Sequence, residues 1–197
     1  MSVPDNLDAL LQQLDGNDVL IRLAVHDRLI AYGAAVVEPL IALLRDGTTK
    51  QAACAITVLG AIGDHRAIEP LIGMLHASHV LIRMNAAKAL SSFGEPAVLT
   101  ALLDSLNDRD ELVQSWVLNS LGALGNRQVV GSIIAFLEHT PSPDMRYMAI
   151  RALGDLGDQQ AIAHILPYLA DENHHVKADA EKALARLGYS DAPEKAS

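Results

Sequence analysis

Half of the 197 residues are hydrophobic (50%) but only 4% are aromatic, a composition that suits closely packed helices rich in Ala, Leu, Ile and Val. The formal net charge of -9 argues against non-specific nucleic-acid binding and against anionic membrane surfaces. The single cysteine, Cys54, excludes an intrachain disulfide and favours a reducing compartment. Because the N-terminus lacks the basic and apolar regions of a signal peptide, we expect a cytoplasmic protein.

Apolar residues at helical spacing predict about twelve helices in chain order. A lone helix at about 5–14 is followed by five helical hairpins and by a final helix at about 174–187. Residues 50–77 show how one hairpin is built. Gly63 is expected to end the first helix in a left-handed conformation, and Asp64 to cap the second helix.

The first helices close with a glycine at a regular interval. The intervals, by subtraction, are 30, 31, 31, 32 and 31 residues between Gly33, Gly63, Gly94, Gly125, Gly157 and Gly188. A leucine always stands four residues before this glycine, and a small or β-branched residue stands eight before it. Such a period is typical of stacked helical repeats. We therefore predict an all-α solenoid of about five to six hairpins in one curved right-handed array over residues 1–188, with a polar tail at 189–197.

The repeat phrases are similar to those of a known family. VLIRMNAAKALSSFG (80–94) resembles the "V-R-x-x-A-x-x-A-L-G-x-L-G" first helix of short bacterial HEAT-like repeats, and GDHRAIEPLIGML (63–75) resembles their second helix. The resemblance covers about residues 18–188 and implies a HEAT-like α-solenoid. The family includes phycobilin-lyase subunits, phycobilisome-degradation proteins and di-iron deoxyhypusine hydroxylases. The hydroxylases bind iron through His-Glu dipeptides, and this chain has none.

The basic position of the family's first helix is matched in four repeats. We expect these side chains to bond to carbonyls or acids of the neighbouring repeat and so to tie adjacent repeats together, the alternative being direct ligand binding. The four residues are Arg22, Arg83, Arg146 and Lys177.

The sequence shows no set of residues with recognisable catalytic or metal-binding spacing. Cys54 has no evident histidine partner, and His76 and His79 lack a carboxylate or cysteine that would complete a metal site. We expect Cys54 to be a partly buried small apolar residue. We therefore predict no catalytic residues, no metal and no cofactor.

Small residues on the second helices predict a smooth concave surface for another protein. Glu38, Glu69 and Asp104 lie on or beside this surface, and a flanking column offers Met74, Phe136 and Tyr168. The alternative for the three flanking residues is packing between repeats. Trp116 lies on a first helix, and contact with a partner and packing remain open for it as well.

These observations favour a non-enzymatic scaffold or adaptor that binds a protein through the concave face or the loops at the repeat edges. The acidic balance favours a basic partner, and polar terminal helices favour a monomer. The alternative, implied only by the resemblance, is a bilin lyase or a bilin-handling subunit.

Overall fold

The computed structural model describes residues 6–189, and all regular structure in that range is helical. The chain forms two compact units, Met1–Ser105 and Leu106–Ser197, which are described in turn. Of the predicted tail at 189–197, every residue except Tyr189 lies outside the described residues.

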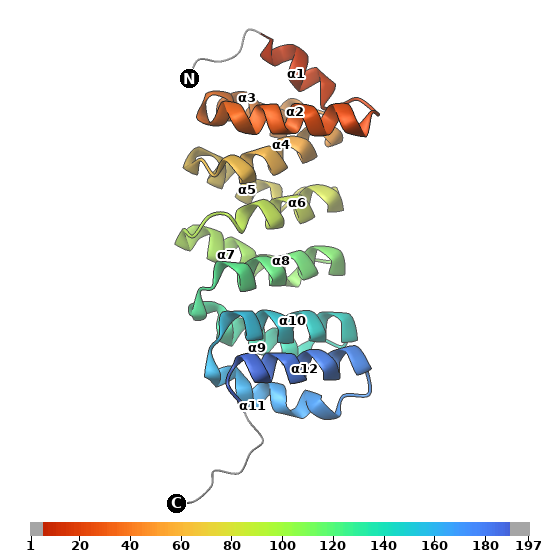
Figure 1. Cartoon of the computed structure of the whole chain (residues 1–197), viewed down its shortest axis with the longest axis vertical. Coiled ribbons are helices and arrows are strands. Elements are labelled where there is room, and N and C mark those ends of the chain that lie inside the picture. The colour runs from red at the N-terminus through yellow and green to blue at the C-terminus, as the bar shows by residue number, and fades with distance from the viewer. Residues whose placement is uncertain (1–5, 190–197) are drawn as a thin grey trace, which may run out of the picture. The chain divides into compact units, whose positions relative to one another are not determined.

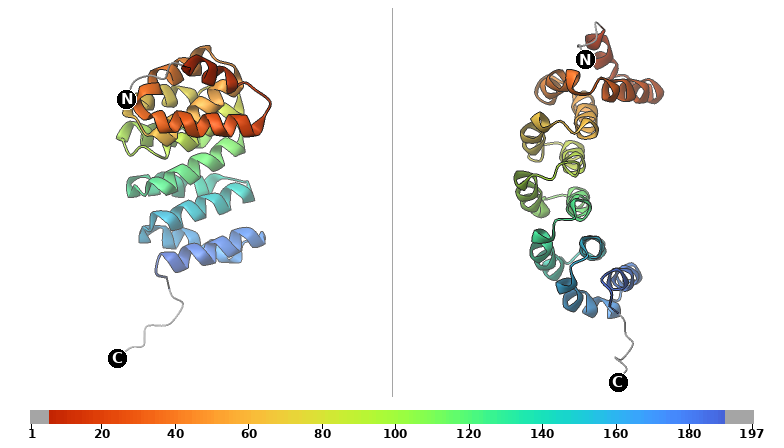
Figure 2. Two further views of the ribbon diagram at one scale, coloured as in Figure 1. Left: turned by 45° about the horizontal axis from the view of Figure 1, so that its top comes forward. Right: turned by 60° about the vertical axis from the view of Figure 1, so that its left-hand side comes forward.

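The first unit stacks three hairpins below a lone N-terminal helix, which lies at the top of Figure 1. Figure 2 shows α2, α4 and α6 in one layer and α3, α5 and α7 in the other. The helices are α1 (Leu7–Gln13), α2 (Val19–Tyr32), α3 (Val37–Asp46), α4 (Thr49–Ile62), α5 (Ile68–Met74), α6 (Val80–Leu90) and α7 (Pro96–Asp104).

The second unit contains two hairpins and a final single helix. Its first helices α8, α10 and α12 form one layer, and the second helices α9 and α11 form the other (Figure 2). The helices are α8 (Glu111–Leu124), α9 (Val130–His139), α10 (Pro143–Leu156), α11 (Ile162–Ile165) and α12 (His174–Arg186). The hairpins of residues 18–170 and the two terminal helices confirm the predicted helix order.

The turn within most hairpins is set by a glycine and the capping residue after it. Gly63 has φ 69° and stands in the left-handed region, and the Asp64 side chain accepts a hydrogen bond from the backbone N–H of Arg66. Asn126 and Asp158 accept the corresponding bond after α8 and α10. The predicted end and cap are therefore confirmed, and a short 3₁₀ turn follows each of these caps.

The third hairpin departs from this pattern at Gly94, which has no positive φ. Helix α6 already ends at Leu90, and α7 starts at Pro96 with no intervening 3₁₀ turn. Glu95 has an extended backbone, because the proline ring disfavours a helical conformation in the residue before it. The chain thus reaches α7 through an extended segment instead of a left-handed glycine.

Another departure lies in the last hairpin, where α11 is only four residues long. The chain continues as a 3₁₀ helix over Leu166–Ala170. Pro167 explains the change, because it has no N–H to donate and its ring clashes with the carbonyl four residues earlier.

The core repeats the same residues in each hairpin. The leucines that stand four residues before the closing glycine are at most 3% exposed in all six first helices, and the small or β-branched residues eight before it are at most 2% exposed. The predicted packing role of both positions is confirmed.

Neighbouring first helices approach most closely where a glycine meets an alanine. A Cβ placed on Gly60 of α4 would lie 2.7 Å from the Cβ of Ala89 in α6. In the second unit, a Cβ on Gly154 of α10 would lie 2.9 Å from the Cβ of Ala183 in α12. These distances are too short for any side chain, so glycine is what allows the two backbones to meet.

Candidate protein-binding surface

The second-helix residues predicted to bind a partner differ in exposure. Glu38, Glu69 and Asp104 are exposed, whereas Met74, Phe136 and Tyr168 are half-buried. The first unit carries Glu38, Glu69, Met74 and Asp104, and the second carries Phe136 and Tyr168.

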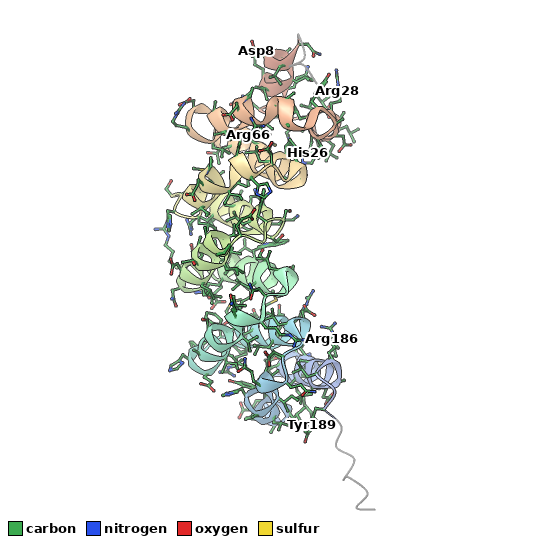
Figure 3. All side chains as sticks on the ribbon, turned by 90° about the vertical axis from the view of Figure 1, so that its left-hand side faces the viewer. Asp8, His26, Arg28, Arg66, Arg186 and Tyr189 are labelled. Atoms are coloured by element: carbon green, nitrogen blue, oxygen red, sulfur yellow. The ribbon has the colours of Figure 1, made fainter. Side chains whose placement is uncertain are left out.

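Two of these residues already have partners in their own unit. Glu38 accepts a hydrogen bond at 3.1 Å from Nη1 of Arg66, the arginine labelled in Figure 3, and this bond links the first two hairpins. The hydroxyl of Tyr168 donates to the carbonyl of Leu137 at 3.1 Å, and burial raises the pKa of this phenol. Both side chains therefore join adjacent hairpins.

The basic residues of the family position mostly bond to the loop before their own helix. Arg22 donates to the carbonyl of Gly16 at 2.6 Å, and the buried Arg83 donates to the carbonyls of Ala77 and Ser78. Each loop joins the preceding helix to the helix that carries the arginine, so these bonds hold the loop against the start of that helix.

Arg146 shows the same arrangement with an added ion pair, and Lys177 does not. Arg146 bonds to the carbonyls of Thr140 and Pro141, and its Nη1 lies 3.1 Å from Oδ2 of Asp171 in the loop before α12. Lys177 is exposed on α12.

Cys54 is half-buried, as the sequence predicted, and desolvation raises the pKa of its thiol. A raised pKa leaves less thiolate at neutral pH, which makes the sulfur a poor nucleophile. Among residues 6–189, no three His, Cys, Asp or Glu side chains gather in a way that could hold a metal ion.

Trp116 is half-buried on α8, in the layer of first helices. It stands nine residues before the closing glycine, and the same position holds Met148 in α10 and Asp179 in α12. The residue at this position varies in chemistry from helix to helix. The buried position four residues before the closing glycine is leucine in every first helix.

Sequence reasoning missed a groove between α10 and α12. It has a volume of about 200 Å³ and is lined by Arg151, Asp179, Lys182, Ala183 and Arg186. The close approach at Ala183, opposite Gly154, brings the two helices together at this point. Stacking thus places three cations side by side in an acidic chain.

One signal in the sequence marks this groove. Arg151 and Lys182 both stand six residues before their closing glycines, and Asp155 and Arg186 both stand two before theirs. Matching positions on stacked helices face the same side, so the register alone predicts that these four side chains are neighbours.

The first unit has an exposed apolar segment at the start of α2. Val19, Leu20, Ile21 and Leu23 are 49–77% exposed. At the position of Ile21, the later helix α6 carries Ile82, which is only 5% exposed. Within residues 6–189, none of the helices has the length and hydrophobicity that a membrane crossing needs.

The chain matches the family model described as HEAT repeats over residues 37–122 and 101–185. An uncharacterized phycocyanin operon protein Z from Pseudanabaena tenuis (strain PCC 7409) is 29% identical over 167 residues, with 79% of this chain and 82% of the relative covered. These matches confirm the predicted HEAT-like repeats and agree with the expected likeness to the phycobilin-lyase group.

Solved structures show the same fold. One is the complex of CpcE and CpcF of phycocyanin lyase from Nostoc sp. PCC7120, with a TM-score of 0.60, 24% identity, and coverage of 92% of this chain and 77% of that chain. Another is a designed armadillo repeat protein in complex with a (KR)4 peptide, with a TM-score of 0.61, 16% identity, and coverage of 93% and 100%. At these identities the likeness is one of fold.

Proposed function

We propose that the chain, which belongs to the HEAT-repeat family, is a scaffold that binds another protein. The contact runs over one helix layer or over the loops at the repeat edges. The sequence favours the face formed by the second helices, whereas Trp116 lies in the layer of first helices. Stacked repeats bury one set of positions and leave another free to vary, which is how solenoids acquire extended binding surfaces.

The observation that carries this proposal is the contrast between the two kinds of row in the second unit. The row of leucines four residues before each closing glycine is buried and uniform, while the half-buried row reads Trp116, Met148 and Asp179 across α8, α10 and α12. Tryptophan is enriched among the residues that contribute most to protein–protein binding. A half-buried indole in a row that varies in chemistry supports a contact role for this layer.

Affinity capture from a lysate of the source organism tests the proposal. Wild type and Trp116→Ala are immobilised at equal density, with Trp116→Phe as the matched control that keeps an aromatic ring. We expect one stoichiometric protein on wild type, a clear loss on Trp116→Ala, and partial retention on Trp116→Phe. If wild type retains no protein that an empty column does not also retain, the scaffold proposal is wrong.

A second candidate function is the handling of a bilin. It is favoured by one observation, the 29% identity to a phycocyanin operon protein. The proposal is tested by adding a free bilin to the purified chain and recording visible absorbance and circular dichroism. A red-shifted band with induced dichroism supports bilin handling, and an unchanged spectrum at micromolar protein removes this candidate.

A further inference from the structure

The geometry points to the α10–α12 groove as the docking site for an acidic segment of a protein partner, which binds through its carboxylates. The inference rests on the proposed scaffold function and names the chemistry of the partner at one place. The net charge of -9 predicts a basic partner, but this groove carries the opposite sign locally.

The cationic side chains of the groove have more N–H donors than its neighbouring carboxylates accept. Arg186 donates through Nη1 to Oδ1 of Asp155 at 2.5 Å, and Lys182 donates to Oδ1 of Asp179 at 3.1 Å. Arg151 is exposed and has no hydrogen bond or ion pair with any residue in the range 6–189. Three cations thus face two carboxylates.

The remaining donors are numerous. A guanidinium offers five N–H groups and an ammonium three, while Arg186 and Lys182 each use one of theirs in these pairs. A carboxylate can accept two parallel N–H bonds from an arginine, a geometry that a single backbone carbonyl does not match. Carboxylate groups therefore fit this donor set, and phosphate groups would fit it as well.

The existing ion pairs do not close the groove. The side chains of Lys182 and Arg186 are 67% and 53% exposed, and exposed pairs of this kind contribute about 0–1 kcal/mol each. A ligand carboxylate can replace Asp179 or Asp155 as the partner at little cost. Helix packing thus holds the cationic side chains of the groove in place, and Lys182 and Arg186 can exchange their present carboxylate partners for those of a ligand.

The positions of the cations match an acidic helix. Arg151 and Asp155 are four residues apart on α10, and Lys182 and Arg186 are four apart on α12. Carboxylates four residues apart on a partner helix lie at a similar spacing of about 5–6 Å between Cβ atoms. Met148, one turn before Arg151, extends the surface with an apolar side chain that suits a protein contact.

The cation cluster is specific to this helix pair. At the positions of Arg151 and Lys182, the α4–α6 pair of the first unit has Thr57 and Lys88. The cation cluster is therefore not repeated at every interface between first helices. It would be repeated if it were needed to pack one repeat against the next.

Fluorescence anisotropy with a rhodamine-labelled octaglutamate peptide tests the inference on the full chain. Wild type should bind octaglutamate more tightly than octalysine despite its net negative charge, and binding should weaken between 50 and 500 mM salt. Arg151→Glu, and separately Lys182→Glu, should each weaken binding about tenfold or more. Circular dichroism on each variant verifies that the helices are retained.

Arg28→Glu is the matched control, since Arg28 is an exposed arginine on α2 of the first unit and the variant has the same change in net charge (Figure 3). It should change the dissociation constant less than threefold. Equal losses in Arg28→Glu and Arg151→Glu, or tighter binding of octalysine, would overturn the inference. If a labelled eight-nucleotide single strand binds as tightly as octaglutamate, the ligand of the groove is a nucleic acid and not a protein segment.

Failure of this inference can be told apart from failure of the scaffold proposal. If a partner is captured from lysate equally by wild type and Arg151→Glu, the scaffold stands and the groove is not its docking site. If octaglutamate binds at the groove but no protein is captured, the scaffold proposal fails while the carboxylate site remains.

Discussion

Replacing Gly60 with alanine should destabilise the first unit, although the same change in an open helix stabilises it. Alanine is favoured over glycine by about 0.8–1 kcal/mol in a helix interior. At Gly60, however, the new Cβ would lie 2.7 Å from the Cβ and 2.9 Å from the Cα of Ala89. The backbone of α6 must move away from α4 to relieve both contacts.

The magnitude follows from two opposing effects. Overpacking in a well-packed core costs about 1–3 kcal/mol, and the helix preference of alanine returns about 1 kcal/mol. The net change is a loss of about 0–2 kcal/mol in the free energy of unfolding. Gly73→Ala is the matched control in the same unit, because nothing lies within 4 Å of its Cβ position in α5.

Urea unfolding followed by circular dichroism measures the difference between these variants. The clash alone separates them by about 1–3 kcal/mol, which is about 0.5–1.5 M in midpoint for a slope of about 2 kcal/mol per M. A midpoint for Gly60→Ala at or above that of Gly73→Ala would refute the reasoning. In a double-mutant cycle, Ala89→Gly should recover part of the loss, with a coupling of about 1 kcal/mol.

Three further changes test the packing and the charges. Asp64→Asn should lower the free energy of unfolding at pH 7 but not at pH 2. Arg66 lowers the pKa of Asp64 to about 2 in the folded chain, so the contribution of this carboxylate is lost as pH falls from about 4 to 2. Urea midpoints measured across this pH range test the prediction. Arg83→Ala should cost about 2 kcal/mol through lost bonds from a buried guanidinium, whereas the exposed Lys177→Ala should change thermal unfolding by less than about 0.5 kcal/mol. Leu20→Lys should leave the urea midpoint unchanged and reduce light scattering at high concentration, because this leucine is 77% exposed; a lower midpoint would show that Leu20 is packed in solution.

The fold could be predicted from the sequence because each repeat carries its own local instructions. A leucine and a glycine recur at fixed spacing in all six first helices, and a capping residue follows the glycine in three of the five hairpins. The departures at Gly94 and Pro167 also have local causes, since a proline overrides the repeat pattern in both places.

The candidate groove could not be read as easily, because its residues come from helices about 31 residues apart. Arg151, Lys182 and Arg186 each resemble an ordinary solvated side chain when their own helix is considered alone. Only the stacking of α10 on α12 through Gly154 and Ala183 brings them together. Predicting such a site requires comparison of register positions across repeats.

The single cysteine and the single tryptophan stand at the same repeat position in different units. Cys54 lies on α4 in the first unit, and Trp116 lies on α8 in the second. Since burial raises the pKa of the Cys54 thiol, an energy-transfer acceptor is best attached to it at mildly alkaline pH. The native chain therefore provides one donor and one labelling site, so that energy transfer reports the separation of its two units as a partner binds.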